Sequence, residues 1–321
     1  MATTRTETLN TFTESTVEHR RKNFVTDGFF GSAPFWAGLA KFGSIRTRGG
    51  SEIRLSLTYA GFTASSFGRG DTFDTDDAEF IEPLIFDYRG GYSKVVVNGF
   101  DAALNEGPEA VFDIVNATME NAELSLVDDL STQAYADGTG NNSNDIDGLA
   151  NAVTRDTSVA YGGVTRATTA NTMGSAVRSA VQDTTGGALS YANVNTAYGD
   201  TTIANEEPNL ITTTQTLRNR IWERSQPSER SVGGEDTRSI GFRGGVRFNN
   251  AVVQVDSHCP TGFLYLLNMK YWSLYVHQNW DFRLRGMFDV HDSFAQVGQF
   301  IFIGNAVCRG PRFQGVMSGL T

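Results

Sequence analysis

The sequence contains little of what a secreted or disulfide-stabilised protein needs. Its 321 residues include two cysteines, Cys259 and Cys308, which form no CxxC pair and cannot build a disulfide framework. Such usage is typical of a chain that folds in a reducing cytosol. The opening stretch MATTRTETLNTFTEST is polar throughout, so no secretory signal is expected.

Long apolar runs and lysines are also scarce. The most apolar window, residues 262–276, contains Lys270 and is too short to span a bilayer, so it predicts one or two buried strands. Lysine occurs 4 times against 22 arginines, a bias that favours interfaces but that codon usage would explain equally well. Charged residues make up 19% of the chain, below the roughly 25% of typical soluble domains. This composition suits a protein that is largely covered by copies of itself.

Motifs that carry chemistry are missing or incomplete. The sequence has no GKS or GKT phosphate loop, no GxSxG elbow and no HExxH. We interpret His258-Cys259, beside Pro260, as a turn, because a nucleophile and its base need spatial geometry and a third, orienting group. Residues 143–148 resemble the first half of a calcium loop, but Thr154 stands where a bidentate Glu is required. No catalytic, cofactor-binding or metal site is predicted.

The net charge of −10 argues against a dedicated nucleic-acid binder, since phosphate contacts need Lys and Arg. The charge is uneven, however: residues 1–50 carry a net +3 and the remainder −13. The densest positive cluster is Arg20, Arg21 and Lys22. A basic N-terminal arm on an acidic body can face DNA on one side. Pairing of this cluster with carboxylates of a neighbouring subunit is an equal alternative.

A long hairpin is predicted after this arm. Residues 52–59 alternate polar and apolar side chains, which indicates a half-buried strand, and a return strand is expected at 80–88. The connection between them, residues 60–79, is rich in Gly and Asp and is long enough to indicate a projecting arm. Its tip is predicted at Gly68, Arg69, Gly70 and Asp71, where we interpret the Arg-Gly-Asp triplet as a turn.

One long helix is predicted after a strand at 94–98. Pro108 suits a first helical turn, and Asp137-Gly138 ends the pattern, for a length of roughly 40 Å. Its apolar stripe comprises Val111, Ile114, Val115, Thr118, Met119, Ala122 and Leu126. Phe112 and Leu124 fall off this stripe, which indicates apolar neighbours on a second side.

The rest of the chain predicts mixed helices and strands. Helices are expected near Asn171 and Ser190 and at 216–223. Strands are expected at 209–213, 246–255, 263–276 and 298–308. The last of these is apolar enough to lie in a sheet shared with the long helix.

Several local sequences, taken together and in order, resemble the major capsid proteins of tailed bacteriophages, which have the Hong Kong 97-type fold. They are Asp147-Gly-Leu149, Tyr161-Gly-Gly-Val-Thr-Arg166, Pro208-Asn-Leu-Ile-Thr212, Arg247-Phe-Asn-Asn250 and the stretch from Tyr265 to Leu274. The resemblance implies an α+β Hong Kong 97-type capsid fold. Its regions would be an N-terminal arm (1–45), an extended β-hairpin loop (46–90), a peripheral domain with a spine helix (91–140 and 281–321) and an axial domain (141–280).

The resemblance also implies a structural protein, not an enzyme, that assembles as hexamers and pentamers into an icosahedral shell around double-stranded DNA. The implied location is the virion, after assembly in the host cytoplasm. Scaffolding, portal and decoration proteins would be separate partners, DNA would be held by non-specific contacts, and neither a cofactor nor a membrane is expected. Some relatives cross-link their shells through a lysine in the extended loop, but residues 42–93 contain none.

Two other classes of protein stay open. An encapsulin-like nanocompartment shell of the same fold would enclose a cargo enzyme instead of DNA. An unrelated enzyme would need a pocket with perturbed acids or bases, which the sequence does not supply.

Overall fold

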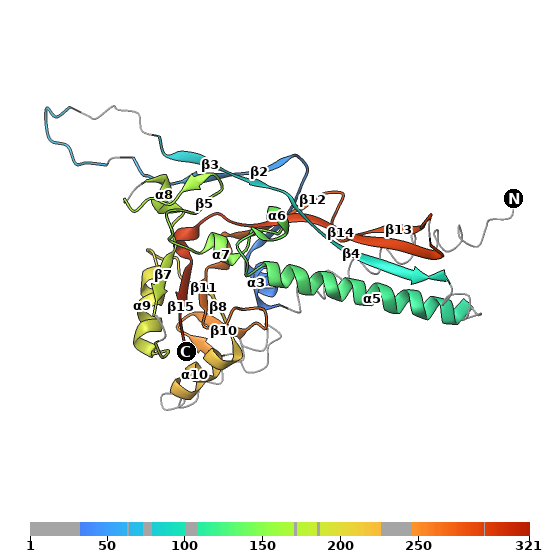
Figure 1. Ribbon diagram of the computed structural model, residues 1–321. Coiled ribbons are helices and arrows are strands. Elements are labelled where there is room, and N and C mark those ends of the chain that lie inside the picture. The colour runs from blue at the N-terminus through green and yellow to red at the C-terminus, as the bar shows by residue number, and fades with distance from the viewer. Residues whose placement is uncertain are drawn as a thin grey trace.

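The computed structural model describes residues 33–62, 64–72, 79–99, 108–169, 172–184, 187–225, 246–291 and 293–321. Over these residues the chain combines one long helix, two larger sheets and a hairpin that extends well beyond the body (Figure 1). The Arg20-Arg21-Lys22 cluster, with residues 1–32 of the predicted arm, lies outside the described residues.

A five-stranded sheet is organised around β14 (Ala295–Cys308), which contains the strand predicted at 298–308. The other strands are β1 (Ser44–Arg48), β4 (Arg89–Asn98), β12 (Trp272–His277) and β13 (Arg283–Asp289). β4 pairs along one edge of β14, while β12 and β13 pair along the other, all antiparallel. β1 adds to β12 in parallel and brings the N-terminal part of the chain to this sheet.

The predicted long helix is confirmed as α5 (Pro108–Gln133). Its stripe residues Met119, Ala122 and Leu126 are buried. The helix packs closely on β4, since a Cβ added at Gly91 would lie 3.3 Å from Leu126. The prediction of an apolar neighbour for Leu124 is wrong within the described chain, since 66% of its surface is exposed. The side chain of Phe112 lies outside the part of the chain that the structure describes.

The predicted hairpin is confirmed by β2 (Glu52–Thr58) and β3 (Ile81–Asp87), whose side chains alternate between buried and exposed. Within the described part of the chain, the body supports the hairpin at its base. There the backbone N–H of Ile85 donates to the carbonyl of Gly162 at 3.0 Å, and the Phe86 ring meets the Tyr161 ring edge-on at 4.9 Å. A two-stranded hairpin is marginally stable alone in water, so this base is what orients the loop.

The second large sheet has six strands, in the order β7-β15-β11-β8-β10-β9. Its strands are β7 (Ala180–Asp183), β8 (Leu210–Thr213), β9 (Val246–Phe248), β10 (Ala251–Val255), β11 (Leu264–Leu267) and β15 (Gly315–Ser318). Two helices, α9 (Tyr191–Thr201) and α10 (Gln215–Ser225), share a buried apolar cluster with it. The strand predicted at 209–213 and the helices predicted near Ser190 and at 216–223 are thereby confirmed.

Three predicted elements differ in length. The stretch 246–255 is two antiparallel strands, because Asn249 adopts a positive φ of 49° and turns the chain. The stretch 263–276 divides into β11 and β12, which join different sheets on either side of the 3-10 turn η3 (Met269–Tyr271). The helix expected near Asn171 is a single turn, α8 (Met173–Ala176), with a capping box from Thr172 and Ser175.

Short elements complete the described chain. They are α3 (Pro34–Phe42), α6 (Gly140–Ser143), α7 (Leu149–Ala152), β5 (Ala160–Tyr161), β6 (Val164–Thr165) and η4 (Pro311–Phe313). α3 docks on this chain's own core, where the Phe35 ring meets the Trp272 ring edge-on at 5.2 Å. The aromatic part of the predicted arm, from residue 33, is therefore anchored to its own subunit.

The sheets cross the predicted domain boundaries. β13 and β14 share a sheet with β4, whereas β15, from the same predicted segment 281–321, pairs with β7 and β11 in the six-stranded sheet. β12, from the predicted axial segment, lies in the five-stranded sheet. The division into 1–45, 46–90, 91–140 with 281–321, and 141–280 stays a prediction.

Candidate functional site

The loop beyond the β2–β3 pairing extends away from the body (Figure 1). Phe62 and Phe67 are 63% and 69% exposed. At the start of the loop, the N–H of Tyr59 donates to the carbonyl of Phe80, and the rings of Phe62 and Phe80 lie 4.8 Å apart. Grouped exposed apolar side chains are typical of interaction surfaces.

The four residues predicted at the loop tip are described and exposed. They form a turn in which the N–H of Gly68 donates to the Asp71 carboxylate and the N–H of Asp71 returns to the carbonyl of Gly68 at 3.4 Å. Gly70 has a φ of +99°, which favours glycine at this position. The role of Gly68, Arg69, Gly70 and Asp71 in assembly stays a prediction.

The five-stranded sheet has a second face that α5 does not cover. Along β4, Val95 and Val97 are buried on the helix side, while Tyr92 and Val96, pointing the other way, are 71% and 44% exposed. Phe288 on β13 is 55% exposed. We call this outer surface the open sheet face.

Register places basic and apolar residues together on the open sheet face. Lys94, Gln299 and Arg285 form one cross-strand row. The adjacent row is Val96, Val297 and Phe288, and the Arg285 guanidinium lies 5.4 Å from the centre of the Phe288 ring. Sequence reasoning missed this surface, although the alternation in Arg283-Leu-Arg285 is the signal that could have indicated it.

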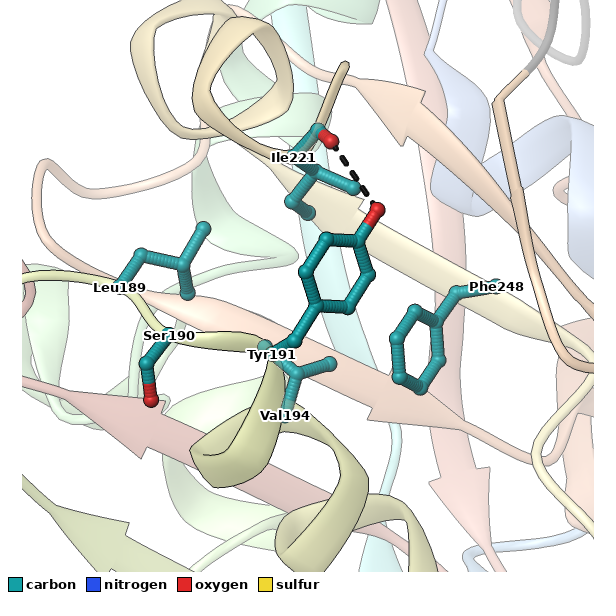
Figure 2. Close-up of a pocket in the computed structure, with 6 residues that line it drawn as sticks. All are labelled: Leu189, Ser190, Tyr191, Val194, Ile221 and Phe248. Atoms are coloured by element: carbon teal, nitrogen blue, oxygen red, sulfur yellow. Dashed lines mark hydrogen bonds between the residues drawn. The ribbon is translucent and has the colours of Figure 1, made fainter. Parts of the chain in front are cut away.

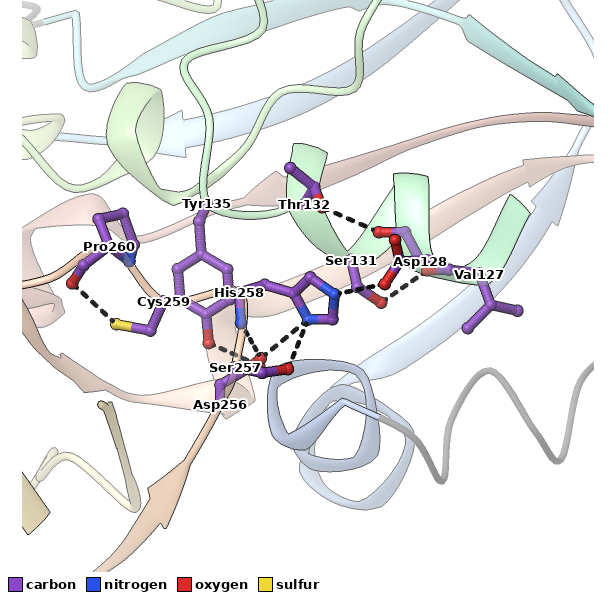
Figure 3. A network of polar contacts seen from close by, with 10 residues as sticks. All are labelled: Val127, Asp128, Ser131, Thr132, Tyr135, Asp256, Ser257, His258, Cys259 and Pro260. Atoms are coloured by element: carbon purple, nitrogen blue, oxygen red, sulfur yellow. Dashed lines mark hydrogen bonds and ion pairs between the residues drawn. The ribbon is translucent and has the colours of Figure 1, made fainter. Parts of the chain in front are cut away.

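A polar network joins the end of α5 to the turn after β10 (Figure 3). The His258 ring contacts Asp256 through Nδ1 at 3.1 Å and Asp128 through Nε2 at 2.9 Å. The hydroxyl of Tyr135, just beyond α5, donates to the other oxygen of Asp256 at 2.8 Å. The sequence showed the His258-Cys259 turn but not Asp128, its partner 130 residues away.

The thiol in this turn is not activated. Burial, helped by the charge of Asp256, raises the pKa of Cys259 to about 12. A thiol so far from ionisation is a poor nucleophile at neutral pH. The interpretation of His258-Cys259 as a turn agrees with this geometry.

A small hollow lies between α9, α10 and β9 (Figure 2). It is lined by Leu189, Ser190, Tyr191, Val194, Ile221 and Phe248. The Tyr191 hydroxyl is already engaged, since it donates to the carbonyl of Ile221 at 3.3 Å. The lining is apolar and does not gather the polar groups that a substrate site needs.

The calcium-like stretch 143–148 uses its carboxylates internally. Asp145 accepts a hydrogen bond from the amide of Asn141 at 2.6 Å, and Asp147 accepts one from Asn305 at 2.7 Å. Across the described residues, no three His, Cys, Asp or Glu side chains are grouped so that they could hold a metal ion. In the same part of the chain, no helix has the length and apolar character needed to cross a membrane.

Comparison with solved structures identifies the fold. The chain is similar to the capsid of cyanophage A-1(L), with a TM-score of 0.70, 16% sequence identity and coverage of 90% of this chain and 93% of that one. It is also similar to the capsid of a native GTA particle, with a TM-score of 0.61, 8% identity and coverage of 89% and 90%. The encapsulin of a holo complex from Synechococcus elongatus follows at a TM-score of 0.53 and 10% identity, covering 89% and 88%.

No protein-family model and no curated protein sequence matches the chain. The structural similarities confirm the predicted α+β, Hong Kong 97-type capsid fold. At these identities they establish the fold and leave the function to be argued from the surfaces.

Proposed function

We propose that this chain is the major capsid protein of a tailed bacteriophage. It assembles as hexamers and pentamers of itself into an icosahedral shell around double-stranded DNA, and it acts as a structural protein, not an enzyme. The observation that carries the proposal is the projecting loop with exposed Phe62 and Phe67. In an isolated chain more than half of each ring is exposed, so a neighbouring copy is the natural cover for that exposed area. The similarity to phage capsids supports this reading.

The loop and the open sheet face are complementary in charge. Residues 61–80 contain five acidic side chains and one basic side chain, with four phenylalanines. The open sheet face offers Lys94 and Arg285 beside Tyr92 and Phe288. The loop of one subunit, with its tip at Gly68–Asp71, docks on this face of the next. Opposite charges would set the orientation, and the aromatic rings would supply the buried apolar area.

The remaining partners follow from the same role. The shell is the chain's place in the virion, and folding and assembly take place in the host cytoplasm. Scaffolding, portal and decoration proteins are separate chains, and DNA is touched without sequence preference. No membrane takes part.

The purified chain is expected to form closed, uniform particles. Negative-stain imaging and sedimentation at micromolar concentration, over a range of salt, measure this directly. The expected result is shells with five- and six-subunit clusters. A uniform monomer or dimer under every condition would overturn the proposal.

An encapsulin-like nanocompartment shell is the second candidate, because the Synechococcus elongatus encapsulin shares the fold. The contents of particles purified from the native source separate the two. Nuclease-protected double-stranded DNA supports the phage capsid, while a packaged enzyme without genome supports the nanocompartment.

Neutralising Arg20, Arg21 and Lys22 together, each to Gln, tests the proposed inner-face arm. If the cluster faces DNA, empty shells form normally, but genome retention weakens and the loss depends on salt, because phosphate contacts release counterions. Particle yield and DNA content at several salt concentrations are the measurements. If the cluster pairs with carboxylates of a neighbour, empty shells form poorly instead. Normal assembly with normal retention would contradict both roles.

A further inference from the structure

His258 lies between two carboxylates that come from different parts of the fold (Figure 3). Asp128 belongs to the last part of α5, and Asp256 follows β10 in the six-stranded sheet. The ring reaches both, with Nε2 at 2.9 Å from Asp128 and Nδ1 at 3.1 Å from Asp256. The His258 side chain therefore bridges the long helix and the second sheet, beside the hydrogen bond from Tyr135 to Asp256.

The number of N–H donors on the His258 ring decides which charge state of the ring this geometry requires. Carboxylate oxygens only accept hydrogen bonds, and a neutral imidazole has one N–H to donate. A neutral His258 would turn a lone pair toward one of the two carboxylates, which repels it. Both contacts are favourable only when the ring carries both protons and is cationic.

The buried end of the network is already rigid. Asp256 is 2% exposed, and its Oδ2 accepts from the Tyr135 hydroxyl at 2.8 Å. Its Oδ1 also accepts from the backbone N–H of His258 at 3.0 Å. Burial and the nearby Asp256 charge raise the pKa of Tyr135. Its hydroxyl therefore stays protonated and acts as the hydrogen-bond donor to Asp256. The imidazole thus sits on a fixed carboxylate and reaches outward to Asp128, whose side chain is 77% exposed.

We propose that protonated His258 is a latch that holds the end of α5 against the six-stranded sheet, and that the latch opens at alkaline pH. When the ring loses a proton, the Asp256 carboxylate still accepts from the backbone N–H of His258 and from the Tyr135 hydroxyl. The exposed Asp128 contact is then the one that is lost. The last part of α5 then loses this contact with the turn after β10, while the Tyr135–Asp256 hydrogen bond and the buried core stay in place.

The surrounding groups support the direction of this switch. Burial lowers the pKa of His258, but the hydrogen bonds and charges of Asp128 and Asp256 outweigh it and raise the pKa above the ordinary 6.5. Among the residues that the structure describes, the other titratable groups at the junction include Asp129 on α5, Cys259 in the turn, Tyr135, and Tyr265, whose ring packs on that of Tyr135. The pKa of Asp129 is itself raised, by burial and then by the charge of Asp145. Because the folded pKa of His258 is raised, the stabilisation is complete below pH 6.5 and disappears as pH rises through the folded value.

In a shell, the latch would control how firmly the long helix is held to the sheet below it. That consequence rests on the proposed function, whereas the latch itself rests on contacts within one chain. The tests below use the full-length, unassembled chain. A failure of shells to form would therefore overturn the proposed function and leave the latch to be judged separately.

Replacing His258→Gln tests the bridge, because one amide group cannot donate to both carboxylates from the ring's two positions. Thermal unfolding is measured at half-unit steps from pH 6 to pH 9.5. We expect the variant to melt about 2–5 °C lower than the parent at pH 6 and to converge with it at the alkaline end. His277→Gln, in β12 of the other sheet, is the matched control and is expected to keep the parent's pH slope. An unchanged slope in His258→Gln would overturn the latch.

Asp128→Asn gives an independent readout, since Asp128 is exposed and its replacement leaves the core intact. The chain has 4 histidines, so ring-labelled NMR resolves their titrations. We expect His258 to titrate above 6.5 in the parent and at a lower pH in Asp128→Asn. Asp137→Asn, beyond the end of α5, is the control and is expected to leave the titration unchanged. A parent His258 that titrates at or below 6.5, or one that is indifferent to Asp128→Asn, would overturn the proposal.

Discussion

Deleting residues 65–75 is expected to abolish particles while leaving the subunit folded. The deleted stretch lies beyond the β2–β3 pairing and carries the exposed Phe67 and the tip turn Gly68–Asp71, and its described residues, 65–72, include none of the buried core. Shortening a loop changes closure entropy little, so the unfolding transition of the isolated chain is expected to shift by less than about 1 kcal/mol. Sedimentation and imaging measure assembly, and chemical denaturation measures the fold.

Replacing residues 65–75 with a Gly and Ser sequence of equal length tests whether assembly needs the side chains of the loop or only its length. The replacement keeps the length of the connection but removes two phenylalanines, Phe67 and Phe73, and the charges that would meet the neighbour. We expect this variant also to lose particles. If it assembles like the parent, the docking surface lies elsewhere on the loop, and if the deletion itself assembles normally, the projecting loop has no part in the shell.

The reciprocal change lies on the open sheet face. Lys94→Glu with Arg285→Glu replaces two positive charges with negative ones in a single cross-strand row. Like charges would then face the acidic loop, so assembly is expected to weaken most at low salt, where screening is least. This salt dependence distinguishes lost docking from a folding defect, which denaturation of the isolated chain would reveal.

Local patterns predicted the elements whose structure is set locally. The alternation over residues 52–59 predicted a strand because one face of the hairpin base is buried and the other is exposed. The stripe through Met119, Ala122 and Leu126 predicted α5 because those residues pack on β4. In both cases the burial pattern repeats with the period of the backbone.

Pairing between distant segments was not predictable in the same way. β14 contacts β4, which lies about 200 residues earlier, and β12 and β13, which immediately precede it. The apolar sequence of β14 does not indicate which of these strands it pairs with. The separation of β11 from β12 depends on Asn268, whose side chain accepts from the N–H of Lys270 and starts the η3 turn. Lys270 interrupted the apolar run in the sequence, but it could not show that the two halves enter different sheets.

The Tyr161–Arg166 segment contributed to the family resemblance, but its sequence did not predict the structural role of Arg166. Arg166 is 1% exposed, and its guanidinium donates to three backbone carbonyls: Val177 at 3.0 Å, Val159 at 2.6 Å and Asn151 at 2.5 Å. The three carbonyls come from separate turns of the chain. Arginine is suited to this position because its planar group presents several donors in fixed directions.

Replacing Arg166→Met is therefore expected to cost about 3–5 kcal/mol of unfolding free energy. Methionine keeps much of the volume but donates nothing, so three carbonyls lose their partner in an enclosed site. Arg166→Lys keeps a charge but cannot reach three directions at once, and we expect it to recover part of the loss. Denaturant unfolding of the unassembled chain measures both.

The exposed Arg155 provides the matched control, since Arg155→Met removes a guanidinium from the same region and is expected to change the free energy by less than about 0.5 kcal/mol. Because Tyr161 and Gly162 in the same segment hold the hairpin base, Arg166→Met is also expected to reduce particle yield through a loosely oriented loop. A loss below about 1 kcal/mol would mean that the three carbonyls find other donors, and the segment would then not be the support of the loop.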